Sequence, residues 1–102
     1  MAWTVKIDDE VAAEIEGWPS EAQEELASRL VVLQKYGPQL GRPYVDQLKG
    51  SRYPNLKELR FSTSDGGIWR VVFAFDPHRC AVVVAGGDKK GKDEQRFLSK
   101  AD

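Results

Sequence analysis

The sequence predicts one α+β domain in which an N-terminal strand and a two-helix hairpin pack on an antiparallel sheet. Three observations predict this class: alternating apolar residues open the chain, helical periodicity follows up to about residue 36, and apolar strands joined by short turns lie between residues 56 and 87. No crossover helix separates these last strands, which favours antiparallel pairing. A chain of 102 residues can bury one core but not two, so no domain boundary is expected.

The first strand and helix are predicted from short apolar patterns. Apolar residues alternate with polar ones over residues 3–7, as in a half-buried outer strand. Asp8 or Asp9 is suited to cap the helix that follows, because its side chain can accept hydrogen bonds from the first backbone N–H groups. One face of this helix carries the apolar residues Val11, Ile15 and Trp18. Pro19 is expected to end it.

The clearest helix follows Pro19 and stops at Gly37. Ser20 and Gln23 have the spacing of a capping box. An apolar stripe comprises Ala22, Leu26, Leu30 and Leu33. Acidic residues occupy its first turns and basic residues its last, which complements the helix dipole, so the acidic cluster has a sufficient structural explanation.

A long connection rich in glycine, proline and polar residues spans residues 37–55. Connections of this length are uncommon in compact domains and are often functional. Its candidates for phosphate or base contacts are Arg42, Lys49, Arg52 and Tyr53. A plain link from the helices to the sheet explains it equally well.

Alternation along the last strands sorts their side chains onto two faces. The face predicted to pack on the helices carries Trp69, Val71, Phe73 and Phe75. Arg70 then lies on the opposite face, and if Arg60 shares that face, Glu58 projects beside both. A last helical segment is expected from about Asp93 to Lys100.

The net charge of −1 conceals a segregation of charge along the chain. Residues 1–41 hold three bases against eight acids, giving −5, whereas residues 42–102 hold twelve bases against eight acids, giving +4. A basic half suits phosphate binding, although +4 is small for a nucleic-acid-binding protein. Ordinary solvated strands and loops remain an alternative on charge alone.

Other classes of site receive little support. The one cysteine, Cys80, lies in an apolar run and is expected to be a small buried side chain, and His78 is expected in a turn. No phosphate-binding glycine loop and no cluster of metal ligands is found, so neither a nucleotide nor a metal cofactor is expected. Without a leader or a membrane-spanning stretch, a cytoplasmic protein is expected.

The basic side chains on the sheet suggest chemistry on a polyanion. Paired guanidinium groups suit phosphate binding and a phosphorane-like transition state, and Lys89 and Lys90 would add charge at the strand end. An RNA 2′-hydroxyl can attack the neighbouring phosphate without a metal, and Glu58 is the only plausible carboxylate base. A surface ion-pair network of little energetic value is the alternative.

The order of these elements resembles the RelE/ParE toxin superfamily, and more closely its HigB-like, phage-derived branch. The resemblance is carried by the segments Leu40-Gly41-Arg42-Pro43, Val45-Asp46-Gln47-Leu48-Lys49-Gly50, Asn55-Leu56-Lys57-Glu58-Leu59-Arg60, Trp69-Arg70-Val71-Val72-Phe73-Ala74-Phe75 and Gly86-Gly87-Asp88-Lys89-Lys90. It implies a single RelE-like, microbial RNase-like domain over residues 1–102. It also implies a type II toxin that cleaves mRNA on the ribosome and is neutralised by an antitoxin, expected to be of the helix-turn-helix type.

The resemblance assigns roles to particular residues. The implied catalytic set is Arg60, Arg70, Glu58 and Lys89, and the implied RNA-binding set is Lys57, Lys90, Arg52, Lys49 and Phe97. Relatives often carry a tyrosine where this chain has Phe97, which can stack on a base but cannot transfer a proton, so the general acid stays open. A non-enzymatic, ParE-like inhibitor of DNA gyrase and a decayed toxin that only binds an antitoxin remain alternatives.

Overall fold

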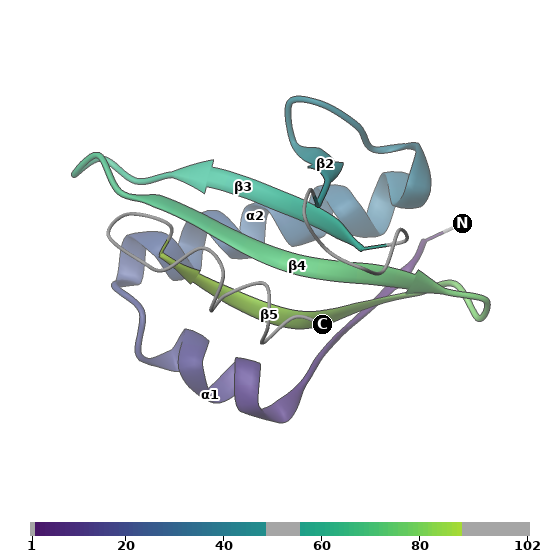
Figure 1. Cartoon of the computed structure of the whole chain (residues 1–102), viewed down its shortest axis with the longest axis horizontal. Coiled ribbons are helices and arrows are strands. Elements are labelled where there is room, and N and C mark those ends of the chain that lie inside the picture. Colours follow the sequence, from purple (N-terminus) through teal and green to yellow (C-terminus); the bar gives the residue numbers. More distant parts are fainter. Residues whose placement is uncertain (1, 49–55, 89–102) are drawn as a thin grey trace.

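The structure, a computed structural model, describes residues 2–48 and 56–88. Its elements are β1 (Thr4–Ile7), α1 (Asp9–Glu16), α2 (Ser20–Tyr36), the 3-10 helix η1 (Gly37–Gln39), β2 (Val45–Gln47), β3 (Lys57–Ser62), β4 (Ile68–Asp76) and β5 (Cys80–Asp88). The strands form one five-stranded sheet in the order β1-β5-β4-β3-β2. Figure 1 looks onto one face of this sheet, with α2 behind it. The predicted α+β class is confirmed, and the helix expected near residues 93–100 lies outside the described residues.

The sheet differs from the predicted antiparallel meander at both of its edges. β1 pairs in parallel with β5, from Thr4 opposite Cys80 to Ile7 opposite Val83. β2 pairs antiparallel with β3 and lies within residues 37–55, the segment predicted to be a long connection. Both pairings were missed because neither is a local property: β1 joins a strand at the other end of the chain, and a three-residue strand shows no periodicity.

The two helices begin in different ways. Asp8 caps α1 as predicted, since its Oδ2 atom accepts a hydrogen bond from the Glu10 N–H at 3.2 Å. The capping box predicted at Ser20 is wrong, because Pro19 occupies the N-cap of α2 and makes no side-chain cap bond. The Gln23 Nε2 atom instead donates to the Trp18 carbonyl at 2.9 Å, which fastens the turn between the helices to α2.

The main core lies between the helices and one face of the sheet. The predicted stripe of α2 is confirmed, with Leu33 fully buried against the sheet. The core members contributed by the strands are Val45, Leu59, Phe61, Val71, Phe73, Ala81 and Val83. Cys80 is buried, as expected of a small apolar side chain.

A second apolar cluster lies on the face of the sheet that does not carry this core. Its buried members are Leu48, Leu56, Val72 and Ala85. This face is therefore not a plain solvated surface. Among the described helices, none is long and apolar enough to cross a membrane.

Candidate functional site

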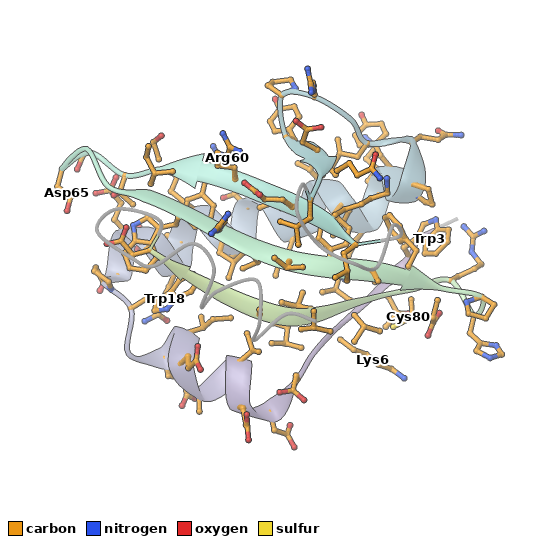
Figure 2. All side chains as sticks on the ribbon, viewed as in Figure 1. Trp3, Lys6, Trp18, Arg60, Asp65 and Cys80 are labelled. Carbon is orange, nitrogen blue, oxygen red and sulfur yellow. The ribbon has the colours of Figure 1, made fainter. Side chains whose placement is uncertain are left out.

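Two arginines stand directly opposite each other on neighbouring strands. Arg60 of β3 pairs with Arg70 of β4 in the antiparallel register, so both project from the same face, as the sequence predicts. Figure 2 shows Arg60 on β3, away from the Asp65 turn that joins β3 to β4. Like charges placed directly opposite across strands destabilise a sheet, so this pair requires a compensating anion.

Glu58 supplies that anion. Its Oε1 atom lies 2.8 Å from Arg60 Nε, and its Oε2 atom lies 3.5 Å from Arg70 Nη1. One carboxylate therefore contacts both guanidinium groups, which confirms that the three residues share a face. We refer to Glu58, Arg60 and Arg70 as the arginine–glutamate cluster.

Members of the arginine–glutamate cluster differ sharply in exposure. Arg70 is 2% exposed and Glu58 5%, whereas 51% of the Arg60 side chain is exposed. The structure therefore buries Arg70, one of the two arginines that the sequence suggests for phosphate binding. The second apolar cluster supplies part of the reason, because Val72, opposite Glu58 in the register, is fully buried on the same face. A surface ion-pair network does not describe this arrangement either, since the carboxylate and one guanidinium are out of water.

β2 extends the charged face toward the edge of the sheet. Asp46 stands opposite Glu58, and its Oδ2 atom lies 3.0 Å from Arg42 Nη2 in a largely exposed ion pair. Immediately before β2, the Tyr44 carbonyl accepts a hydrogen bond from the Arg60 N–H at 3.4 Å. The sequence reasoning missed Asp46 and Tyr44, because only the register of β2 reveals where they lie.

Of the remaining predicted site residues that the structure describes, Lys57 lies away from this cluster. Lys57 pairs with Phe73 in the register and so lies on the helix-covered face with Leu59, and its RNA-binding role stays a prediction. His78 is exposed in the turn before β5. The predicted residues that lie outside the described part of the chain are Lys49, Arg52, Tyr53, Lys89, Lys90 and Phe97.

The chemistry open to the cluster follows from its charge. Two guanidinium groups face one carboxylate, so the three side chains carry one net positive charge, which suits a singly charged phosphodiester. Both Glu58 oxygens contact guanidinium nitrogens, so the carboxylate would have to leave one of them to accept a proton. Glu58 is therefore better placed to hold the arginines than to act as a base. Among residues 2–48 and 56–88, no group of three His, Cys, Asp or Glu side chains could hold a metal ion.

Comparison with known proteins identifies the family. Residues 13–101 match the family described as phage derived protein Gp49-like (DUF891). The chain belongs to this Gp49-like family. It is 37% identical to the toxin-family protein HigB2 of Mycobacterium tuberculosis over 98% of this chain and 49% of that protein. It is also 42% identical to HigB3 of the same organism over 70% of this chain and 60% of that protein. The Gp49-like chain thus spans less than two thirds of the length of each relative, 49% of HigB2 and 60% of HigB3.

Solved structures confirm the RelE-like fold. A mutant of the Escherichia coli toxin RelE in its free state superposes with a TM-score of 0.71 at 19% identity, covering 98% of this chain and 97% of RelE. The archaeal RelE–RelB complex of Pyrococcus horikoshii matches with a TM-score of 0.63 at 18% identity, covering 90% of this chain and 100% of the matched chain. The family match and the HigB relatives confirm the predicted resemblance to the HigB-like, phage-derived branch, and the solved structures confirm the fold.

Proposed function

We propose that this Gp49-like protein is the toxin of a type II toxin–antitoxin system and cleaves mRNA on the ribosome without a metal ion. The observation that carries the proposal is the register pair of Arg60 and Arg70, both contacted by Glu58, on a RelE-like sheet. Support comes from the toxin names of its HigB relatives. In this proposal residues 1–102 act as one toxin domain in the cytoplasm.

The proposed reaction is an internal attack within the RNA backbone. The 2′-oxygen forms a bond to phosphorus as the bond from phosphorus to the 5′-oxygen breaks, the 2′-proton leaves to a base, and the departing 5′-oxygen receives a proton. Negative charge accumulates on the phosphoryl oxygens in the transition state. Arg60 and Arg70 would stabilise that charge, because guanidinium groups stay protonated and offer a planar fork of donors.

Because Arg70 is buried, a bound phosphate would contact the two arginines one after the other. A phosphate would first meet the half-exposed Arg60, and would reach Arg70 only when the groups that cover it move aside. Glu58 would keep both guanidinium groups in place until then. Lys89, Lys90 and Phe97, assigned by resemblance to the toxin family, remain proposed contacts to the RNA.

The test is induction of the protein in cells followed by mapping of mRNA 5′ ends. Arg70→Ala should reduce cleavage by about 10²- to 10³-fold, the usual effect of removing one donor to a transition-state oxyanion. Arg60→Ala should also reduce cleavage. Lys35→Ala, which removes a charge from the exposed end of α2, is the matched control and should stay toxic. An Arg70→Ala variant as toxic as the parent would remove the mechanism.

A second candidate is a non-enzymatic, ParE-like inhibitor of DNA gyrase. The observation that favours it is the 2% exposure of Arg70, since a protein that only binds a partner has no need of an open phosphate site. Gyrase poisoning would give DNA-damage signalling and filamentous cells with intact mRNA, whereas an RNase stops translation first. A decayed toxin would leave growth unchanged.

The proposed partner is an antitoxin encoded next to this gene. The archaeal neighbour in fold was solved as a complex with RelB, which supports a protein partner for this chain as well. Co-expression with the adjacent open reading frame should suppress toxicity and yield a complex that purifies as one species. A partner of the helix-turn-helix type is expected.

A further inference from the structure

Tyr44 occupies the position directly across from Arg60. In the pairing of β2 with β3, Val45 stands opposite Leu59 and Asp46 stands opposite Glu58. The hydrogen bond from the Arg60 N–H to the Tyr44 carbonyl continues this ladder by one residue. Val45 is buried in the helix-side core, and continuing the alternation of β2 by one residue, into the turn that precedes it, assigns Tyr44 to the opposite face, the face of the arginine–glutamate cluster.

Two of the exposed large apolar side chains belong to strands or turns next to Arg60. Within the described residues, the exposed large apolar side chains are Val31 at 63%, Tyr36 at 47%, Tyr44 at 45% and Ile68 at 39%. Val31 and Tyr36 lie on α2. Tyr44 stands across the strand from Arg60, and Ile68 lies two residues before Arg70 on the same face of β4. Arg60 therefore has an exposed tyrosine across from it in the turn before β2 and an exposed aliphatic side chain, Ile68, on β4.

We propose that Tyr44 is the platform on which a base of the bound RNA stacks while the adjoining phosphate is held at Arg60. The inference rests on the proposed function and deepens it by assigning a nucleobase subsite. Proteins recognise single-stranded RNA by stacking its bases on aromatic side chains and holding its backbone with basic ones. Side chains directly opposite across an antiparallel pair have Cβ atoms about 5 Å apart, which suits the base and phosphate of neighbouring nucleotides.

Induction of the full-length protein and mapping of mRNA 5′ ends tests this subsite. Tyr44→Ala should reduce cleavage by about 5- to 150-fold, the range expected from the loss of one stacked base, and should alter the base preference beside the cut. Tyr44→Phe keeps the ring and should cleave as the parent does. Tyr36→Ala removes a tyrosine of matching exposure from α2 and should have no effect.

A binding measurement gives a second readout that a purely structural role would not change. The purified protein is titrated with a short single-stranded RNA and with the same RNA carrying one abasic nucleotide. The parent should bind the complete RNA more tightly, and Tyr44→Ala should lose that preference.

The outcomes separate this subsite from the proposed function. If the parent cleaves no mRNA, both fail. If the parent cleaves and Arg70→Ala does not, but Tyr44→Ala matches Tyr36→Ala, the subsite alone is wrong. If Tyr44→Phe is as impaired as Tyr44→Ala, the hydroxyl matters rather than the ring, which overturns stacking.

Discussion

Glu58 holds two guanidinium groups although only 5% of it is exposed. Burial of a carboxylate is costly unless cations and hydrogen bonds compensate, and here Arg60 and Arg70 provide that compensation. The same carboxylate reduces the repulsion between the two arginines. Loss of this one charge therefore affects both the stability of the sheet and the geometry of the proposed phosphate site.

Glu58→Gln is expected to lower the free energy of unfolding by about 2–4 kcal/mol, because it leaves the buried Arg70 guanidinium without that counter-charge. Chemical denaturation measures the change. The control is Glu25→Gln, which breaks a partly exposed ion pair with Arg29 on α2 and should cost less than about 1 kcal/mol. Equal losses for the two variants would show that the burial of Glu58 has no energetic consequence.

Strand alternation in the sequence places Arg70 opposite the predicted core face and puts Glu58 and Arg60 on one face of their own strand, and the register of β3 with β4 then brings all three onto one face. It does not reveal that Arg70 is buried, because burial depends on what covers a face and not on which face a residue takes. The second apolar cluster on that face combines residues from β4 and β5 with others beside β2 and β3. Such long-range packing leaves no local signature in the sequence.

The junction between β1 and the end of α2 is a tightly packed point of the fold. Gly37 has a φ of 57°, and a Cβ atom added there would overlap the Trp3 indole. The backbone N–H of Trp3 donates a hydrogen bond to the Gln34 carbonyl at 2.7 Å. The Trp3 ring also makes an edge-on contact with Phe75. Arg79 lies over the indole, 4.8 Å from its centroid.

Gly37→Ala is expected to destabilise the protein by at least about 2 kcal/mol, through a left-handed backbone that disfavours alanine and through overlap with Trp3. That loss corresponds to a fall of roughly 8 °C or more in the melting temperature of a domain of this size. Calorimetry measures it. Gly41→Ala is the matched control, since a Cβ atom there meets nothing within 4 Å. A melting temperature that falls equally in both variants would contradict the packing argument.

The acidic start of α2 has a role beyond the helix dipole. Glu21 accepts hydrogen bonds from the backbone N–H and the hydroxyl of Ser64, each at 2.6 Å, and so ties the β3–β4 turn to the helix. The sequence predicts the helix, the strands and the turn, because each has a local pattern. It does not predict this contact, which joins residues 43 positions apart.

Charge is distributed unevenly over the whole molecule. The −5 segment of residues 1–41 builds both helices, whereas the arginine–glutamate cluster lies on the face of the sheet that does not carry the helix-side core. A net charge of −1 repels RNA weakly at long range. The RNA binding proposed above would therefore depend on local contacts at the sheet and not on the overall field.

This dependence on local contacts predicts how binding to single-stranded RNA responds to salt. Each phosphate contact contributes about 0.7 to the slope of log affinity against log salt concentration, because a counterion is released. Arg60→Ala should therefore make the slope shallower by about 0.7 between roughly 50 and 200 mM salt, as measured by fluorescence anisotropy. Lys35→Ala removes the same charge from α2 and should leave the slope unchanged. Equal changes of slope in the two variants would mean that RNA affinity depends on the total charge of the molecule. Arg60 would then not be a specific phosphate contact.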